Sequence, residues 1–332
     1  MTKNFAVLSS GGDAPGMNAA VRAVVLACER EGGQVIGYRY GYNGLLSQSC
    51  RNLNAKTVHN LIQQGGTVLH SGRCPEFKSE QSAKTAAANL NEKAIDCLIV
   101  IGGDGSFRGA AHLSKYWSGQ VIGLPGTIDN DIPGTDATIG YYTAIETAVT
   151  SIDKVRDTAD AFERLFLVEV MGRHAGFLAL KAAIASASDY VILPELFESE
   201  DKSLNEIELQ LHKHRKDVEH DSFIIVVAEN VWPGGLDALS SSLAQRTGSE
   251  IRPVILGHVQ RGGSPVSQDR ILATKLGCEA VQAAYDGDNC IMIGEQKGEL
   301  VRTPLSEVCD ASKPLTASTV KTMKLLLNNR YA

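Results

Sequence analysis

The stretch DCLIVIGGDGS, residues 96–106, joins a continuous apolar run to a glycine-rich turn. No polar residue interrupts the run from Cys97 to Ile101, so a strand formed here must be buried on both of its faces. Strands of this kind are typical of parallel sheets that carry helices on both sides. The stretch therefore predicts an α/β fold, with a turn at the point where a strand ends and a helix begins.

The same alternation of apolar strands and longer helical patterns continues over most of the chain. Strands are predicted at 4–10, 34–40, 96–103, 120–126, 164–172, 190–195, 222–229 and 252–259, and helices at 17–31, 56–64, 79–92, 141–158, 174–187, 203–217, 236–246, 268–286 and 315–328. This series predicts two doubly wound, mostly parallel (Rossmann-like) domains with the active site in the cleft between them. One domain is expected to comprise 1–140 and about 255–308, and the other about 141–254 and 309–332.

The composition narrows the class of protein. The formal net charge of −6 argues against nucleic acid as a main partner, because binding of a phosphate backbone needs a clustered positive surface. The first residues lack the pattern of a secretory signal, and no apolar run approaches the roughly 20 residues that span a bilayer. We therefore expect a cytoplasmic protein with neither a nucleic-acid nor a membrane partner.

Cysteine and histidine do not form a recognisable metal-binding pattern. The seven cysteines are scattered without a CxxC pair, which favours reduced thiols over a disulfide framework or a zinc site. His212 and His214 lie two residues apart and so face different sides of a helix. We interpret them as part of a solvated helix end rather than as metal ligands.

The loop after the first strand, GGDAPGMN, has the glycine spacing of a P-loop from Gly11 to Gly16. Met17 and Asn18 stand where that motif needs Lys and Ser or Thr, so a Walker NTPase is excluded. A glycine-rich turn at a helix N-terminus suits an anion such as phosphate. A tight turn that needs glycine for positive φ explains the same residues equally well.

The turn GGDGS, residues 102–106, follows the strand with which we began. It is not the dinucleotide fingerprint, because the glycine after Gly105 comes one position late. The glycines on either side of Asp104 allow a large ligand to approach the backbone, and a single carboxylate can hold a magnesium ion that keeps several waters. A helix cap is the alternative role for Asp104; the flanking glycines favour a nucleotide site.

The next loop, GLPGTIDNDIPGTD (123–136), brings three aspartates together. Neighbouring carboxylates repel each other and any anionic substrate, so a cation or a proton-transfer role is expected. One aspartate can accept a proton from a hydroxyl nucleophile, which typically accelerates a reaction by roughly 10²–10⁴-fold. The alternative is a turn in which the aspartates bond to their own backbone.

Later loops supply the opposite charge. Arg173 lies in a glycine turn after a strand, Glu229 ends another strand, and IRPVILGHVQRGGSP carries Arg252, His258 and Arg261. Guanidinium groups bind phosphate in a bidentate manner. Together the loops indicate a kinase that acts on a phosphorylated hydroxyl compound.

Five motifs, SGGDAPGMN, GGDGS, PGTIDND, EVMGRHAG and GHVQRGGSP, occur in this order along the chain. The set closely resembles the bacterial-type ATP-dependent 6-phosphofructokinases and covers essentially the whole sequence. The resemblance implies that ATP and fructose 6-phosphate react, with Mg²⁺, to give ADP and fructose 1,6-bisphosphate, the committing step of glycolysis. It also implies a homotetramer whose active sites are shared between subunits.

The resemblance assigns roles to individual residues. ATP-contacting positions match Gly12, Arg73, Cys74, Gly103, Asp104, Gly105 and Ser106, in the domain 1–140 plus about 255–308, with Asp104 on the metal. Asp129 matches the base that takes the proton from the sugar 1-hydroxyl, and Thr127, Asp131 and Arg173 match the other catalytic positions. The positions that bind the sugar phosphate, mainly in the other domain, match Thr127, Ile128, Asp129, Met171, Gly172, Arg173, Glu229, His258, Val259, Gln260 and Arg261. Arg164 and Arg252 match positions that an adjacent subunit donates.

Two positions distinguish this chain from a pyrophosphate-dependent phosphofructokinase, which is the nearest alternative. Relatives that use pyrophosphate typically carry Asp where this chain has Gly105 and Lys where it has Gly126, and a side chain at Gly105 would occupy space that the α-phosphate needs. An NAD kinase shares the GGDG loop but has no counterpart to GTIDND or HVQRGGSP. A catalytically silent nucleotide-sensing subunit would not need both Asp104 and Asp129.

The effector site of the family is only partly matched. Regulated bacterial members bind ADP through a basic cluster; Arg22 and Arg156 match it, whereas Leu26, Ala55 and Asp221 stand where a cation is expected and Asp189 replaces a glutamate. Each charge-assisted hydrogen bond contributes roughly 1.5–3 kcal/mol. We therefore expect weak or absent activation by ADP.

Overall fold

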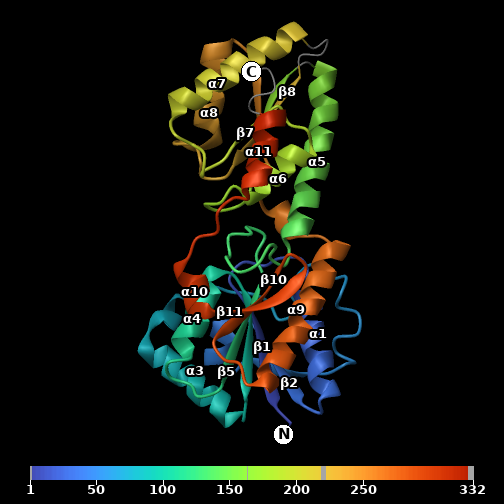
Figure 1. The fold of residues 1–332 in the computed structure, drawn as a ribbon, viewed down its shortest axis with the longest axis vertical. Coiled ribbons are helices and arrows are strands. Elements are labelled where there is room, and N and C mark those ends of the chain that lie inside the picture. Colours follow the sequence, from blue (N-terminus) through green and yellow to red (C-terminus); the bar gives the residue numbers. More distant parts are fainter. Residues whose placement is uncertain (1, 163, 218–221, 328–332) are drawn as a thin grey trace. The chain divides into compact units, whose positions relative to one another are not determined.

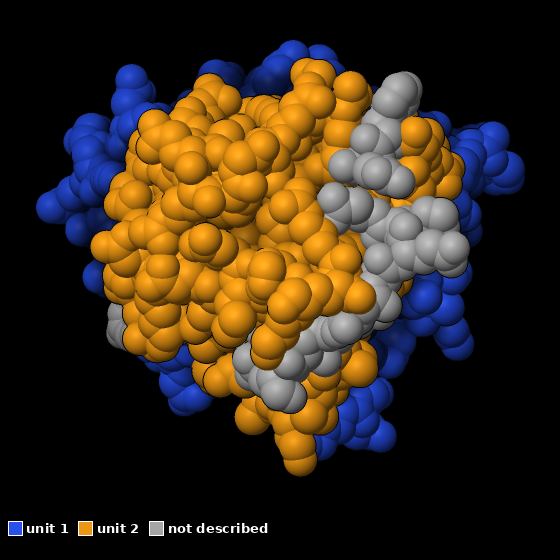
Figure 2. All heavy atoms as spheres, turned by 90° about the horizontal axis from the view of Figure 1, so that it is seen from above, with its two compact units in different colours: residues 1–128, 132–143, 261–313 blue, residues 129–131, 144–260, 314–332 orange. Residues whose placement is uncertain are grey.

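The computed structural model describes residues 2–162, 164–217 and 222–327 of the chain. Clustering of contacts divides the chain into two compact units, coloured separately in Figure 2. Unit 1 consists of Met1–Ile128, Ile132–Thr143 and Arg261–Lys313, and unit 2 consists of Asp129–Asp131, Ala144–Gln260 and Pro314–Ala332. Each unit is built around its own sheet, so the two are described in turn.

The sheet of unit 1 has the strand order β11-β10-β5-β4-β1-β2-β3 (Figure 1). Its strands are β1 (Asn4–Ser10), β2 (Gln34–Tyr38), β3 (Cys50–Leu53), β4 (Cys97–Gly102), β5 (Gln120–Pro125), β10 (Ile291–Gln296) and β11 (Glu299–Pro304). The central strands pair in parallel, and the two edge strands β3 and β11 pair antiparallel with their neighbours. Strand β4 is buried along its whole length, as its uninterrupted apolar sequence predicts.

Helices of unit 1 cover this sheet. They are α1 (Met17–Arg30), α2 (Tyr42–Leu46), α3 (Glu80–Glu92), α4 (Asp104–Leu113), α9 (Ser267–Asp286), α10 (Leu305–Asp310) and the 3₁₀ helix η1 (Pro75–Lys78). Leu98 and Val100 of β4 share one buried cluster with Leu90 of α3 and Phe107 of α4. Helices α1 and α9 pack closely, because a Cβ at Gly277 would lie only 2.8 Å from the Cβ of Ala23.

The sheet of unit 2 has the order β7-β8-β6-β9, and all of its strands are parallel. Its elements are β6 (Leu165–Val170), β7 (Tyr190–Ile192), β8 (Phe223–Ala228), β9 (Ile251–Ile255), α5 (Tyr141–Phe162), α6 (Phe177–Ala185), α7 (Glu200–Asp217), α8 (Gly235–Thr247), η2 (Gly257–Arg261) and α11 (Ala317–Leu326). Phe166 and Val168 belong to a cluster with α5 and α6, whereas Leu165 and Leu167 belong to one with α7 and α8. Successive residues of β6 are thus buried on opposite faces, which confirms the doubly wound α/β prediction.

Two sequence predictions of local structure are wrong. Residues 56–64 form a series of turns instead of a helix. Asn54 and Thr57 start these turns, because the Asn54 side chain accepts from the Thr57 N–H at 3.0 Å and the Thr57 hydroxyl accepts from the Asn54 N–H at 2.8 Å. The strand predicted to reach residue 259 ends at Ile255, and the 3₁₀ helix η2 follows from Gly257, whose φ is +57°.

Three strands, β3, β10 and β11, were not predicted at all. β3 and β11 are edge strands with mixed polar sequences, CRNL and ELVRTP, that lack a buried apolar run. Within the described part of the chain, no helix is both long and apolar enough to cross a membrane.

Candidate active site

Three loops of unit 1 that carry predicted site residues begin next to one another. Ser10 at the end of β1 pairs with Gly102 at the end of β4, and Gly102 pairs with Pro125 at the end of β5. Because these neighbouring parallel strands end at the same level, the loops that follow them share one edge of the sheet. Ligands of doubly wound sheets bind at this edge.

The glycine-rich loop after β1 ends at the N-terminus of α1. Gly11 and Gly16 both have positive φ, +86° and +107°, which favours glycine at each. No side chain caps the N-terminus of α1, so its first N–H groups are not satisfied by a capping residue. An uncapped helix N-terminus behind a glycine turn is an arrangement that suits an anion.

The segment that carries Arg73 and Cys74 is held beside this loop. The Gly11 N–H donates to the Gly72 carbonyl at 3.2 Å, and the Ser71 hydroxyl donates to the Gly11 carbonyl at 2.8 Å. Arg73 is exposed, and burial raises the pKa of the Cys74 thiol, so this cysteine is not an activated nucleophile. The structure thus brings Gly12, Arg73 and Cys74 together in unit 1.

Arg261 reaches the same loop. Its Nη1 donates to the carbonyl of Asp13 at 3.1 Å, and a Cβ added at Gly12 would lie 2.7 Å from that nitrogen. Any side chain at position 12 would therefore displace the guanidinium from its present place over the loop. The resemblance in sequence assigns Arg261 only to the sugar phosphate. It gives no indication that Arg261 also contacts the glycine-rich loop after β1.

Asp104 is the first residue of α4 and forms an ion pair with Arg108 one turn later, with 3.0 Å between Asp104 Oδ1 and Arg108 Nε. About a third of the Asp104 side chain is exposed, so its carboxylate is accessible to a cation. Gly105 is exposed as well, and no atom lies within 4 Å of the position where its Cβ would be. There is open space beside Gly105 in unit 1.

Gly126, in contrast to Gly105, is closely surrounded by other side chains. A Cβ there would lie 2.9 Å from Met17 Cε and 3.0 Å from Ile101 Cγ2, so the first carbon of a lysine side chain would require both of these side chains to shift. The Thr127 N–H donates to the Ile139 carbonyl at 3.1 Å, and the Thr138 hydroxyl donates to the Thr127 carbonyl. These bonds close the loop after β5 on itself and fix its start.

The first aspartate of this loop is buried, whereas Asp131 is partly buried and Asp136 is exposed. Asp129 is 7% exposed, Thr127 is 8% exposed, and Ile128 is fully buried. Asn130, which follows Asp129, is also buried and has a φ of +53°, a left-handed conformation that Asn adopts more readily than most residues. The loop thus holds several polar side chains away from water, where a substrate hydroxyl could be their partner.

In unit 2, Glu229 binds the turn that follows β6. Its Oε1 accepts from the Gly172 N–H at 3.0 Å and from the Arg173 N–H at 2.5 Å, while the Asn230 side chain donates to the Arg173 carbonyl at 2.9 Å. Arg173 has a φ of +62°, which points two successive N–H groups at one carboxylate oxygen. Burial and the neighbouring Glu229 raise the pKa of Glu169, the acidic residue within β6.

The same turn is joined to η2 by Gln260. Gln260 is fully buried, and its Oε1 accepts from the Met171 N–H at 3.3 Å while its Nε2 donates to the Gly257 carbonyl at 3.0 Å. His258 and Val259, by contrast, are exposed. Met171, Gly172, Arg173, Glu229 and Gln260 are thus linked by hydrogen bonds within unit 2.

Arg164 and Arg252, predicted to act in an adjacent subunit, both lie at the start of paired strands: Arg164 directly precedes β6, and Arg252 is the second residue of β9. Both form ion pairs with Glu250, Arg164 through Nε at 3.2 Å and Arg252 through Nη2. Phe166 of β6 pairs with Arg252 of β9, which explains why the two guanidiniums meet. The sequence did not predict a role for Glu250. Its only indication was that Glu250 lies two residues before Arg252, directly ahead of the exposed strand β9.

In the structure, too, the residues at the expected effector positions differ from the basic cluster that would bind ADP. In unit 1 the Ala55 N–H donates to both carboxylate oxygens of Glu29, at 3.2 and 3.1 Å. In unit 2 the buried Asp189 accepts from the Ile224 N–H at 2.9 Å, and Arg156 donates to the carbonyls of Ser186 and Ala187. Asp221 lies outside the described residues.

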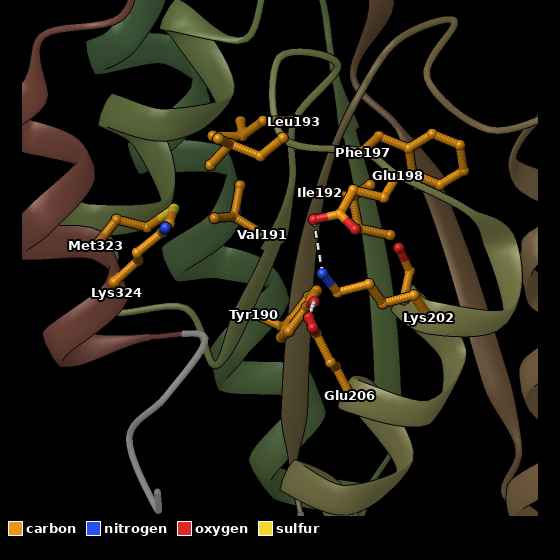
Figure 3. Close-up of a pocket in the computed structure, with 12 residues that line it drawn as sticks. Tyr190, Val191, Ile192, Leu193, Phe197, Glu198, Lys202, Glu206, Met323 and Lys324 are labelled. Carbon is orange, nitrogen blue, oxygen red and sulfur yellow. Dashed lines mark hydrogen bonds and ion pairs between the residues drawn. The ribbon is translucent and has the colours of Figure 1, made fainter.

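A pocket elsewhere in unit 2 contains none of the predicted site residues (Figure 3). It is lined by Tyr190 to Leu193, by residues of the following loop and α7, and by Met323 and Lys324 of α11. Lys202 donates to Glu198 and Tyr190 donates to Glu206, each at 2.6 Å. These polar groups therefore already have partners.

Comparison with known proteins identifies the family to which the chain belongs. Residues 4–284 match the family model for phosphofructokinase. The chain is 43% identical over 324 residues to an ATP-dependent 6-phosphofructokinase 1 of Thermus thermophilus, covering 98% of this chain and 99% of that one. It is 44% identical over 329 residues to an ATP-dependent 6-phosphofructokinase of Fusobacterium nucleatum, covering 99% and 100%. This chain belongs to the phosphofructokinase family.

Solved structures give the same result for the architecture. The phosphofructokinase of Saccharomyces cerevisiae superposes with a TM-score of 0.86 at 35% identity, over 98% of this chain and 46% of that one, so the chain spans about half the length of the yeast protein. A pyrophosphate-dependent phosphofructokinase of Marinobacter aquaeolei has a TM-score of 0.83 at 22% identity, over 95% of this chain and 86% of that one. The latter likeness shows the shared fold only.

Proposed function

We propose that this chain transfers the terminal phosphoryl group of ATP to the 1-hydroxyl of fructose 6-phosphate, forming fructose 1,6-bisphosphate in the committing step of glycolysis. The observation that carries the proposal is its similarity to ATP-dependent 6-phosphofructokinases over essentially their whole length. The open space at Gly105 and the close packing at Gly126 support ATP over pyrophosphate as the donor. We place the protein in the cytoplasm.

Unit 1 is proposed to bind ATP through Gly12, Arg73, Cys74 and Gly103–Ser106. The uncapped N-terminus of α1 behind the glycine loop supports binding of phosphate oxygens by backbone N–H groups. The exposed guanidinium of Arg73 lies in the segment that Gly72 attaches to this loop. Gly105 leaves room for the nucleotide where any other side chain would project into that space.

A magnesium ion fits Asp104. Among the described residues, no group of three or more His, Cys, Asp or Glu side chains could hold a metal on its own, as expected for Mg²⁺ that binds through one or two carboxylates, waters and substrate phosphates. About a third of the Asp104 side chain is accessible, and its ion-pair partner Arg108 also donates to the carbonyl of Cys309. The ion would offset negative charge on the phosphates when bound.

Asp129 is proposed to accept the proton of the sugar 1-hydroxyl as its oxygen attacks phosphorus, with Thr127 and Asp131 orienting the reacting groups and Ile128 lining the site. The burial of Asp129 supports this role, because a carboxylate that little water reaches stays available to the substrate hydroxyl. Arg173 is proposed to stabilise charge on the transferred group. Phosphoryl transfer needs little from the protein beyond such positioning and electrostatics.

Unit 2 is proposed to bind the sugar phosphate through Met171, Gly172, Arg173, Glu229, His258, Val259 and Gln260, with Arg261 of unit 1 contributing its guanidinium. The hydrogen bonds of Glu229 and Gln260 support a preformed pocket wall. We further propose a homotetramer in which Arg164 and Arg252 bind the 6-phosphate of a neighbouring subunit. Their shared contact with Glu250 supports this, because it keeps both guanidiniums at one place before a phosphate arrives.

The purified protein should be offered ATP or pyrophosphate together with fructose 6-phosphate, tagatose 6-phosphate or sedoheptulose 7-phosphate, with and without Mg²⁺. We expect turnover with ATP, Mg²⁺ and fructose 6-phosphate, and a new phosphate signal at carbon 1 by ³¹P NMR. Turnover with pyrophosphate alone would replace the proposal by the alternative donor. Nucleotide binding without turnover would instead identify a silent sensing subunit.

A further inference from the structure

A fully buried carboxylate lies at the beginning of α9. Asp269 is 0% exposed, and both of its oxygens accept hydrogen bonds. Oδ1 accepts from the Gly140 N–H at 2.8 Å, and Oδ2 accepts from the Thr143 N–H at 2.7 Å and from the Thr143 hydroxyl at 2.5 Å. The acid of one helix therefore caps the N-terminus of another, α5.

Asp269 is linked to a second segment through Thr143. Gly140 is the last residue of the loop that carries Thr127 and the aspartates, and Thr143 lies in the first turn of α5, which follows that loop. The Thr143 hydroxyl also accepts from the Val266 N–H at 3.1 Å, and Val266 lies in the segment between Arg261 and α9. One carboxylate and one hydroxyl thus join the loop after β5 to the segment after Arg261.

A third loop packs directly against this junction. A Cβ at Gly140 would lie 2.5 Å from the Cβ of Ala14, and a Cβ at Gly16 would lie 2.9 Å from Ile139 Cγ2 and 3.4 Å from the Cβ of Asp269. The glycine loop after β1 and the end of the loop after β5 therefore touch through positions where only glycine fits. A shift of Gly140 would therefore move both the glycine loop after β1 and the end of the loop after β5.

The chemistry of the site demands a carboxylate. The groups that face its oxygens, from Gly140, Tyr142 and Thr143, are donors, so an amide at position 269 would place one of its own N–H groups against another donor. The Thr143 hydroxyl could rotate to accept from such an amide, but the backbone N–H groups of Gly140 and Thr143 can only donate, so the amide would still lose part of the hydrogen bonding that the carboxylate has. Burial raises the pKa of the Asp269 carboxyl, and the hydrogen bonds from Thr143 and Gly140 oppose that rise.

We propose that Asp269 is a positioning residue for phosphoryl transfer, which holds the loop with Thr127 and Asp129 in register with the glycine loop at Gly12 and with the segment after Arg261. The proposal rests on the proposed function. Asp269 touches none of the reacting groups; it acts through Gly140, Thr143 and Val266. Displacing a catalytic loop by about 1 Å can lower a rate by on the order of 10²-fold.

The test compares Asp269→Asn with Asp286→Asn, which removes an exposed carboxylate from the other end of the same helix. For Asp269→Asn we expect kcat to fall by roughly 10- to 100-fold while both KM values stay within about threefold, because the loss concerns alignment of bound substrates. Asp286→Asn should leave both parameters unchanged. Thr143→Ser keeps the hydroxyl and should retain most activity, whereas Thr143→Val should reproduce the loss of kcat.

Amide hydrogen exchange supplies a readout that does not depend on turnover. In Asp269→Asn, exchange should accelerate in 14–17 and 127–143 and stay as in the wild type in β6 and β8. A kcat within twofold of the wild type, or unchanged exchange in these two segments, overturns the positioning role. If the wild type does not phosphorylate fructose 6-phosphate, the proposed function fails, and the exchange pattern alone then decides whether Asp269 holds the loops.

Discussion

The most direct test of the donor assignment is Gly105→Asp. Gly105 is the second residue of α4, it is exposed, and no atom lies within 4 Å of the Cβ that the substitution adds. An acidic residue in the first turn of a helix is stabilising by about 0.3–1 kcal/mol, and replacing a helical glycine gains up to about 1 kcal/mol. The variant should therefore fold at least as stably as the wild type, so that a loss of ATP binding cannot be blamed on unfolding.

The magnitude of the effect follows from Coulomb's law. A carboxylate about 5 Å from one phosphate charge costs about 0.8 kcal/mol in bulk water and about 3.3 kcal/mol at an effective dielectric constant of 20. These values correspond to a rise in KM for ATP of about 4-fold to about 250-fold. Because the site is at the surface of unit 1 but becomes covered by the nucleotide, we expect a value between these limits, with KM for fructose 6-phosphate within about twofold.

Steady-state kinetics with ATP varied at saturating fructose 6-phosphate measure this change. Gly105→Asn is the matched control, because its side chain has nearly the same shape without the charge, so the difference between the two variants isolates the electrostatic part. Raising the salt concentration should reduce that difference. A KM for ATP within twofold of the wild type in Gly105→Asp would refute the assignment of the open space to the nucleotide.

Three further predictions concern other parts of the chain. Asp129→Ser should keep binding of both substrates, measured by calorimetry, and lower kcat by roughly 10²–10⁴-fold through loss of the base; unchanged turnover would remove Asp129 from that role. Saturation curves for fructose 6-phosphate should shift little on addition of ADP, because Asp189 and Arg156 are already occupied by internal hydrogen bonds; a large leftward shift by ADP would show this inference to be wrong. Burial raises the pKa of the Cys28 thiol from 9.0 to about 12, so its contribution to stability is complete below pH 9 and is lost as the pH rises toward 12, where the folded thiol also ionises. Urea unfolding at pH 7 to 10.5 should show a steeper decline for the wild type than for Cys28→Ala, and equal slopes would contradict the shift.

Elements of the fold were predictable where one physical cause, such as burial of a strand on both faces, determines the sequence pattern. The run 97–101 is apolar without interruption because β4 is buried on both faces, and the strand was found within one residue at each end. The edge strand β3 was not predicted, because a strand at the edge of a sheet needs no continuous apolar run. The helix predicted at 56–64 is not formed: Asn54 and Thr57 make the reciprocal hydrogen bonds of a helix N-terminus, but turns follow and no helix continues from them.

The candidate site was predictable as a set of motifs but not as a set of contacts. The glycine and aspartate loops were recognised from their residues, whereas Glu250 also contacts Arg164 and Asp269 contacts Gly140 and Thr143, partners that are far away in the sequence. Asp269 did leave a signal, because it lies at helical spacing from the buried residues Leu272 and Ala273. An acid on the buried stripe of a helix needs partners, and that spacing could have drawn attention to it.

Both units are assembled from non-adjacent stretches of chain, and this constrains how the protein can be made. The ribosome must pass Lys313 before unit 1 has all of its segments, and unit 2 receives its last segment, with α11, only afterwards. No single cut in the gene therefore yields either unit whole. A nascent chain should gain protease resistance late and nearly all at once, and prematurely terminated products should be degraded rather than persist as half-enzymes.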